Sequence, residues 1–530
     1  MDGPGKAAAT HTEGVKVDLK AAEADPAGGC GCSLKRIRDS VPQKYRNELA
    51  ELFKLAGPVV ISQLMIFMIS FVSMVFCGHL GKTELAGVSL SIAVVNVTGI
   101  SIGTGLSLTC DTLISQTYGS GNLKRVGVIL QRGVLILLLA CFPCWAVLIN
   151  TEPLLLAVKQ SPAVARLSQM YVNIFMPALP AAFMYQLQGR YLQNQGIIWP
   201  QVITGAIGNV LNAIINYVFL YPLDMGVQLM LSPSWSLDCL QEWGSFIQLA
   251  IPSMLMLCLE WWIFEVGGFL AGVISEVELG ANSVIYELAI IAYMFPLGFS
   301  AAASVRVGNA LGAGNIEQAK LSCKVPIVCA SILGACKDIF GYIFTSDEEI
   351  LLRVSDVMVI FCFTHLCDAV AGVTGGVLRG AGKQLIGALC NLVGFYFIGF
   401  PIGVSLMFAA KMGIIGLWTG LTVCVLMQSI FFIIYLSKLN WEKAVKEVIK
   451  RFTQLISCNQ SQAGAAASRD EEDHVYQEAH PPEQSKPTTT VGDVLSGTQL
   501  VLRRGLAVLV MFIILAAGIV ASHFLTKMLK

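Results

Sequence analysis

The stretch FIQLAIPSMLMLCLEWWIFEVGGFLAGVI, residues 246–274, decides the fold. It is almost entirely apolar and exceeds the roughly 20 apolar residues that a helix needs to cross a bilayer. Two acids, Glu260 and Glu265, lie inside it, and Glu287 lies in the next apolar run, with no Lys or Arg in either run. A charge at the membrane centre costs roughly 2.5–3.5 kcal/mol on insertion scales, so such acids usually face a polar cavity. The pattern indicates a membrane protein that handles positive charge.

The composition supports a membrane protein. Charged residues make up 13% of the 530 residues, against about 25% in a typical soluble domain. The net charge is zero, which gives no electrostatic reason to expect nucleic acid as a partner. The 16 cysteines are scattered and many lie in apolar runs, which favours packing over a disulfide or metal framework. We expect no metal, no cofactor and no cleaved signal peptide.

The apolar runs predict an all-helical membrane protein with five parts. These are a cytosolic N-terminal tail (1–54), an N-terminal bundle of five spans (55–231), a C-terminal bundle (240–437), a polar cytosolic linker (438–504) and an extra transmembrane helix (505–526). The predicted spans are 55–77, 86–109, 126–149, 167–188, 202–222, 246–274, 283–304, 385–409, 414–436 and 505–526, with weaker candidates at 325–344 and 351–372.

The sequence repeats itself in order. Pro58 recurs as Pro252, 194 positions later, and Gly119 recurs as Gly312, 193 positions later. Glu84 recurs as Glu278 and Gly121 recurs as Gly314 at the same two offsets. Later in the chain the offset is 182, at which Gly205 recurs as Gly387 and Asn209 recurs as Asn391. Ordered matches of this kind predict two homologous bundles. An equal number of spans in each would relate the bundles by an axis along the membrane normal.

The repeat also exposes a gap in the first bundle. In the second half, Gly416 opens a full span, whereas Gly226 at the equivalent place is followed by polar residues and by Pro233. We therefore expect the sixth helix to be absent from this chain. The ninth, at 325–344, is expected to be short, because Lys337 and Asp338 interrupt it.

The loop charges predict an orientation. Cations gather at alternate span ends, and the linker adds more, which places the N-terminus and the linker in the cytosol under the positive-inside rule. The cations concerned are Lys124, Arg125, Arg190, Arg306, Lys320, Lys324, Arg379, Lys383, Lys443, Lys446, Lys450 and Arg451.

Several local motifs together resemble the multidrug and toxin extrusion (MATE) family, and in particular its vertebrate proton-coupled organic-cation antiporters. The resemblance covers about residues 50–440 and the last helix, and it implies two six-helix bundles that form a V-shaped cleft. The chain departs from the family in its sixth and ninth helices, and its first span carries no acid, whereas some branches of the family place a coupling aspartate there. The motifs are Cys77-Gly78-His79-Leu80-Gly81, Cys110-Asp111-Thr112-Leu113-Ile114-Ser115-Gln116, Glu260-Trp261-Trp262, Tyr286-Glu287-Leu288, Arg306-Val307-Gly308-Asn309-Ala310-Leu311-Gly312 and Gly376-Val377-Leu378-Arg379-Gly380.

Four acids are the predicted proton- and cation-binding residues: Glu260, Glu265, Glu287 and Asp368. The first two are five residues apart on one helix and so lie about 140° apart at about 100° per residue, which prevents both from facing one narrow site. The resemblance strengthens the assignment of Glu287. The alternative is that each acid is a structural group satisfied by a neighbouring helix, and for Asp368 a local pair with His365.

Aromatic and amide side chains are predicted to line the substrate cavity: Trp261, Tyr286, Tyr293, Gln63 and Asn96. Aromatic rings attract cations, whereas interfacial anchoring and core hydrogen bonding are the alternatives.

Two polar residues, Asp111 and Gln116, lie toward the cytosolic end of the second span. They are predicted to make a helix-end or gate contact, with a direct role in transport as the equal alternative.

The predicted function is a proton-coupled antiporter that exports organic cations and cationic drugs or toxins across the plasma membrane. The family resemblance implies the apical surface of the cell. Two alternatives stay open: a transport-deficient splice or gene-model variant, and a flippase for lipid-linked substrates. An enzyme is not expected, because no nucleophile–base set, nucleotide loop or metal-ligand spacing is present. The oligomeric state is not determined by these patterns.

Overall fold

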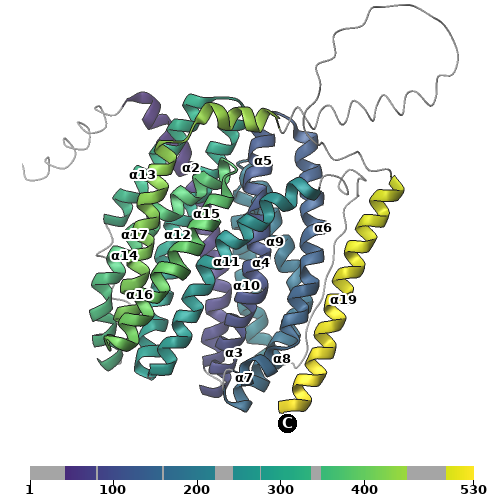
Figure 1. Cartoon of the computed structure of the whole chain (residues 1–530), viewed down its shortest axis with the longest axis vertical. Helices are drawn as coiled ribbons and strands as arrows, with labels where there is room; N and C mark the ends of the chain where they lie inside the picture. The colour runs from purple at the N-terminus through teal and green to yellow at the C-terminus, as the bar shows by residue number, and fades with distance from the viewer. Residues whose placement is uncertain are drawn as a thin grey trace, which may run out of the picture. The chain divides into compact units, whose positions relative to one another are not determined.

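The computed structural model describes residues 42–78, 82–157, 160–220, 243–274, 276–335, 348–450 and 497–529. Across those residues the chain is helical, and no strand occurs among them (Figure 1). The chain divides into two compact units, Met1–Asn47 and Glu48–Lys530. All the contacts discussed below lie within the second unit. The predicted all-helical fold is confirmed.

Two sets of helices follow the sequence repeat, and we call them the first and second halves. The first half comprises α2 (Gln43–Gly78), α3 (Lys82–Val95), the π-helix η1 (Asn96–Ile100), α4 (Ser101–Ser107), α5 (Thr109–Gly119), α6 (Leu123–Leu148), α7 (Thr151–Ala157), α8 (Pro162–Phe175), the 3₁₀ turn η2 (Met176–Ala178), α9 (Leu179–Asn194) and α10 (Trp199–Leu220). The second half comprises α11 (Trp243–Ile274), α12 (Glu276–Gly312), α13 (Ile316–Ala335), α14 (Glu348–Gly380), α15 (Gln384–Asn391), the π-helices η4 (Leu392–Gly399) and η5 (Ser405–Ala409) on either side of α16 (Phe400–Val404), and α17 (Ile414–Ser437). A helical stretch at 441–450 and the last helix, α19 (Gly497–Leu529), complete the described chain.

Nine stretches in the described part of the chain are long and apolar enough to cross a membrane. They are Gln43–Ile69, Gly87–Gly119, Leu123–Leu148, Phe246–Ala271, Ile285–Gly312, Ile360–Gly380, Gln384–Ala409, Ile414–Ser437 and Leu502–Leu525. Helix α10, with 22 residues, matches the span predicted at 202–222. The run at 167–188 is not one regular helix, because the turn η2, which contains Pro177, separates α8 from α9. The predictions that the sixth helix is absent and that the ninth is interrupted concern residues 221–242 and 336–347, which lie outside the described residues.

Helix α19 packs against the first half along α6 (Figure 1). At Gly518 the two backbones come so close that a Cβ atom would lie 2.7 Å from the Cβ of Ala146. The Asn150 side chain donates to the Gly518 carbonyl at 3.0 Å. No part of the apolar stretch of α19 is fully buried, which suits a helix that faces lipid over most of its circumference.

The two halves meet where α5 crosses α12. A Cβ atom on Gly119 would lie 2.2 Å from the Asn309 carbonyl oxygen, and one on Gly312 would lie 2.0 Å from the Gln116 carbonyl oxygen. The two contacts are equivalent, because Gly119 corresponds to Gly312 in the repeat and Gln116 corresponds to Asn309, also 193 positions apart. Only glycine allows backbones to approach this closely. The duplicated sequence therefore meets itself at a pseudo-twofold contact.

Each half also fastens its first helix in the same way. In the first half, Asn209 Nδ2 of α10 donates to the Met65 carbonyl of α2 at 2.7 Å. In the second half, Asn391 Nδ2 of α15 donates to the Met256 carbonyl of α11 at 2.7 Å. The two asparagines are partners in the repeat, so the repeat describes tertiary packing as well as sequence.

The crossing predicts a specific sensitivity to added volume. Replacing Gly312 with Ala should lower the midpoint of thermal unfolding of the purified protein in detergent, because the new methyl group must displace the backbone at Gln116. Overpacking of this kind typically costs about 1–3 kcal/mol. The control is Gly127→Ala in α6, where nothing lies within 4 Å of an added Cβ. Equal midpoints for the two variants would contradict the close crossing.

Candidate functional site

Two acid–tyrosine contacts join α11 to α12. Tyr293 Oη donates to Glu260 Oε1 at 3.3 Å, and Tyr286 Oη donates to Glu265 Oε1 at 3.5 Å. Moving five residues forward along α11 corresponds to moving seven residues back along α12, as expected for antiparallel neighbours. The structure thus assigns the two glutamates to separate sites, in agreement with their predicted angular separation.

The first site, which we call the first acid pair, consists of Glu260 and Asp368. Asp368 comes from α14 and lies near enough for the two charges to act on each other. Two carboxyl groups placed together favour sharing a single proton. His365, the alternative partner considered for Asp368, has its ring stacked on Phe361 with centroids 6.0 Å apart.

The second site combines Glu265, Glu287 and an aromatic wall. The charges of these two glutamates act on each other, and both act on Tyr286. Phe264 stacks on Tyr286 with ring centroids 6.1 Å apart and lies 6.2 Å from Trp418. The sequence prediction did not include Trp418, because its ring reaches this site from α17, far along the chain.

The other predicted cavity residues have separate surroundings. Asn96 begins the π-helix η1, a type of helix that is frequent at functional sites. Gln63 and Trp261 are partly buried on α2 and α11. Trp262, next to Trp261, donates from Nε1 to the Val97 carbonyl at 3.0 Å and so ties α11 to the first half. Within the described chain, no hydrogen bond or ion pair joins the predicted cavity residues of the first half to the acids.

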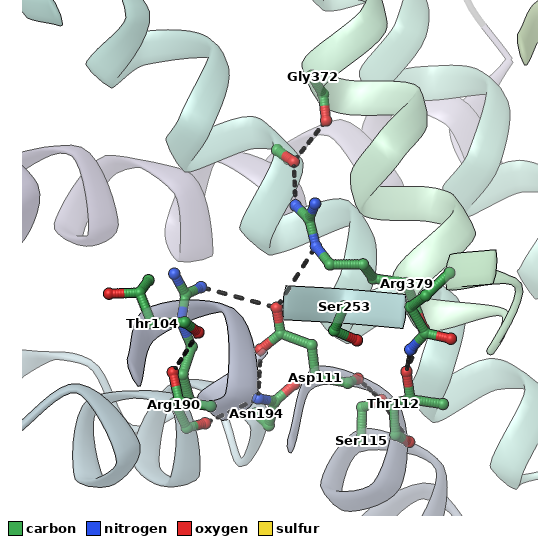
Figure 2. Close-up of polar contacts among 12 residues, drawn as sticks. Thr104, Asp111, Thr112, Ser115, Arg190, Asn194, Ser253, Gly372 and Arg379 are labelled. Carbon is green, nitrogen blue, oxygen red and sulfur yellow. Dashed lines mark hydrogen bonds and ion pairs between the residues drawn. The ribbon is translucent and has the colours of Figure 1, made fainter. Parts of the chain in front are cut away.

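Asp111 lies at the centre of a buried ion cluster, with 1% of its surface exposed. Arg190 Nη1 from α9 and Arg379 Nε from α14 each lie 3.7 Å from Asp111 Oδ2. Asn194 Nδ2 donates to Asp111 Oδ1 at 3.0 Å. Figure 2 shows these three side chains converging on the carboxylate. We call Asp111, Arg190, Asn194 and Arg379 the Asp111 cluster.

Arg379 connects this cluster to the second half. Its Nη2 donates to Ser300 Oγ on α12 at 2.8 Å, and Ser300 Oγ donates to the Gly372 carbonyl at 2.6 Å. Thr112 Oγ1 from α5 donates to the Arg379 carbonyl at 2.5 Å. The charge of Glu260 also acts on Arg379. Hydrogen bonds of Arg379 therefore connect the Asp111 cluster to α12 and α14 of the second half.

The residues predicted to form a gate do bridge the halves. Asp111 reaches Arg379, and Gln116 Nε2 donates to the Gly380 carbonyl at 2.9 Å. Both partners belong to α14 of the second half. These contacts therefore join α5 of the first half to α14 of the second.

A second ion pair between the halves centres on Glu48 of α2, whose surface is 2% exposed. Arg306 Nε donates to Glu48 Oε1 at 2.9 Å, and its Nη2 contacts Oε2. Ser322 Oγ donates to Oε1 at 2.6 Å, and Gln318 Nε2 donates to Oε2. This carboxylate is fully hydrogen-bonded, unlike that of Asp111. We call this contact the Glu48 pair.

Three arginines interpreted from sequence as loop cations are instead structural. The side chains of Arg190 and Arg379 are 8% and 11% exposed, and Arg306 is paired with Glu48. Arg379 also acts on Glu260, although no basic residue shares the apolar run of that glutamate. One signal could have revealed it: Arg379 lies within a glycine-rich apolar stretch rather than beyond it. The described residues contain no cluster of three or more His, Cys, Asp or Glu that could hold a metal ion.

Many membrane-length helices with carboxyl pairs among them define a multi-pass membrane transporter. The family model MatE matches residues 58–218 and 252–405, two segments that begin 194 positions apart, as the sequence repeat does. The chain therefore belongs to the MATE family, which is a family of membrane transporters and not of enzymes.

The chain is similar over most of its length to vertebrate proteins. It is 60% identical to multidrug and toxin extrusion protein 1 of zebrafish, covering 94% of each chain, and 47% identical to the human protein of that name, covering 91% of this chain and 94% of the relative. The zebrafish alignment runs over 557 residues, more than the 530 of this chain, so that relative carries stretches that this chain lacks.

Solved structures have the same fold. The eukaryotic MATE transporter AtDTX14 aligns with a TM-score of 0.68 at 26% identity, covering 77% of this chain and 99% of that one. A multidrug resistance MATE family transporter in an outward-facing conformation aligns with a TM-score of 0.60 at 15% identity, covering 76% and 97%. The second likeness shows the fold alone.

The Asp111 cluster predicts a large stability effect. Asp111→Ala should strongly lower the thermal unfolding midpoint of the purified protein, because it leaves two guanidinium groups buried without their carboxylate. Breaking a buried pair in this way costs about 3–5 kcal/mol. The control is Glu317→Gln, which removes an ion pair with Lys320. The Glu317 side chain is 87% exposed, so this variant should change the unfolding midpoint little. A midpoint for Asp111→Ala equal to the control would contradict a structural role for the cluster.

Proposed function

We propose that this chain is a proton-coupled antiporter that exports organic cations across the plasma membrane. The observation that carries the proposal is the pair of acid–tyrosine contacts, Glu260 with Tyr293 and Glu265 with Tyr286, within membrane-length helices. The printed names of the vertebrate relatives, which describe multidrug and toxin extrusion, support export. The four acids Glu260, Glu265, Glu287 and Asp368 are proposed to bind protons and cations.

Exchange follows from competition for the same carboxyl groups. Removal from water disfavours an ionised carboxylate, so a proton binds readily when no cation is present. An organic cation favours the ionised acid and displaces the proton. Phe264, Tyr286 and Trp418 supply ring faces beside the second site, and each cation–π contact contributes about 0.5–2 kcal/mol. Each unit of pH difference across the membrane supplies about 1.4 kcal/mol per proton.

The proposed transport step is a rocking of two bundles, 55–231 and 240–437, about the α5–α12 crossing. The N-terminal tail (1–54) and the linker (438–504) are proposed to lie in the cytosol, and 505–526 to be the extra span. This orientation places the Asp111 cluster at the cytosolic end of the helices. By family resemblance, the membrane would be the apical one of an excretory epithelium.

A specific observation favours a second candidate, a transport-deficient variant of such an antiporter. The zebrafish relative has stretches that this chain lacks, and the polar sequence after Gly226 predicts no span where the repeat requires a sixth. Full-length transcript sequencing across Gly226 and surface biotinylation of the expressed chain separate the candidates. Recovery of an additional apolar segment there would restore the antiporter assignment, whereas absence of this chain from the surface would favour the variant.

The antiporter proposal predicts pH-driven export of a fluorescent organic cation from vesicles or cells that contain the purified or expressed chain. Glu260→Gln and Glu287→Gln should each reduce the rate at least about tenfold at equal surface amounts, because neither amide can exchange a proton for a cation. Glu317→Gln, which alters an exposed acid, is the control.

Two outcomes would contradict the proposal. One is unchanged pH-driven export by the Glu260 and Glu287 variants. The other is competition by lipid headgroups but not by small organic cations, which would favour the flippase alternative.

A further inference from the structure

The Asp111 cluster contains more positive than negative charge. Two guanidinium groups, of Arg190 and Arg379, approach one carboxylate oxygen, each at 3.7 Å. Arginine stays protonated in proteins, so neither charge can be removed by proton loss. The two approaching nitrogen atoms share Oδ2, which puts them no more than twice that distance apart. Taken alone, the buried cluster has one positive charge too many, and the two arginines repel each other.

The missing negative charge lies in the first acid pair. Glu260 and Asp368 act on each other, and by sharing one proton they supply a single negative charge. A short series of contacts links the two sites. Arg379 donates to Ser300, and Ser300 donates to the Gly372 carbonyl. A Cβ atom on Gly372 would lie 2.8 Å from Tyr293 Oη, and that hydroxyl donates to Glu260.

Charged or titratable groups from four other helices act on Arg379. They are Asp111 on α5, Arg190 on α9, Glu260 on α11 and Tyr293 on α12. The thiols of Cys367 and Cys424 also face the acid pair, and as neutral groups they do not alter this charge count. With the acid pair singly ionised, the whole assembly is neutral.

The arginines belong to different halves of the molecule. Arg190 and Asp111 lie on helices of the first half, and Arg379 lies on α14 of the second. The halves can meet here only if the two guanidinium groups are brought together. The contact is also loosely held, because Asp111 Oδ2 and Arg379 Nε are buried without a hydrogen-bond partner.

We propose that the Asp111 cluster is an electrostatic latch that responds to occupancy of the first acid pair. When the pair holds only its shared proton, its single negative charge offsets the excess positive charge of the arginines and the halves stay together. When a further proton or an organic cation neutralises the pair, the repulsion between Arg190 and Arg379 is no longer offset and the halves separate. Arg379 acts as the positioning residue that connects the two sites.

The latch rests on the proposed function for the identity of the occupant, and it explains a property that exchange requires. Either ligand opens the same contact because each adds one positive charge, whereas the empty protein keeps it closed. An antiporter that cannot rearrange while empty does not leak its driving gradient.

Hydrogen–deuterium exchange of the purified full chain in nanodiscs, without substrate and at one pH, tests the latch independently of transport. Glu260→Gln combined with Asp368→Asn removes the charge of the acid pair, as occupancy does, and should speed exchange in peptides from α5 at least about tenfold relative to the parent. Adding Arg190→Gln to that variant restores neutrality and should return the exchange of α5 to within about twofold of the parent.

A matched control uses the Glu48 pair, the other ion pair between the halves. Glu48→Gln should speed exchange where α2 meets α12 and α13, but Arg190→Gln should not reverse that effect, since Arg190 does not contact Glu48. If the faster exchange came only from a general loss of packing, adding Arg190→Gln would slow it neither in the acid-pair variant nor in Glu48→Gln.

Two results would overturn the latch: no change in α5 exchange for the variant that carries both Glu260→Gln and Asp368→Asn, or failure of Arg190→Gln to reverse the change in that variant. If the variant without both acids does not fold, Arg190→Gln alone must slow exchange in α5, and faster exchange there rejects the proposal. Failure of the antiporter proposal gives a different result. In that case pH-driven export is absent, but Arg190→Gln still returns the exchange of α5 to the parent rate.

Discussion

The buried carboxylate of Asp111 holds together helices that are far apart in the chain. Its partners come from α9 and α14, and Thr112 beside it bonds a carbonyl 267 positions away. In a low-dielectric interior such groups cannot remain without counter-charges, so their pairing constrains how the helices around them are placed. The glycine crossing of α5 and α12 lies within two turns of this cluster and brings the backbones close enough for these contacts.

The two halves share their architecture but differ in chemistry. The pseudo-twofold contact and the two asparagine ties repeat in each half. The four candidate acids, in contrast, all belong to the second half. The position 193 residues after Asp111 is Ser304, a buried hydroxyl with no charge. A duplicated frame thus supports one half that carries the acids and another that supplies Asp111 and Arg190 at the contact.

Some features of the site could be predicted from sequence because they depend on local geometry. The separation of Glu260 from Glu265 follows from helical periodicity alone, and the structure assigns each to its own tyrosine. Asp111 and Gln116 were predicted as gate residues from their polarity near a span end, and both contact α14. Arg190 and Arg379 were misinterpreted as loop cations, because a positive charge at the end of an apolar run looks the same whether it faces water or a buried carboxylate.

The sequence by itself determined the membrane-spanning helices, the internal repeat and the presence of acids in apolar surroundings. These properties depend on hydrocarbon thickness, on residue spacing and on the cost of burying charge, all of which act within short stretches. Only the tertiary structure decided which groups pair: Tyr293 with Glu260, Trp418 with Phe264, and Arg379 with Asp111. Those choices depend on how helices from distant parts of the chain pack, and no local pattern contains the distances between them.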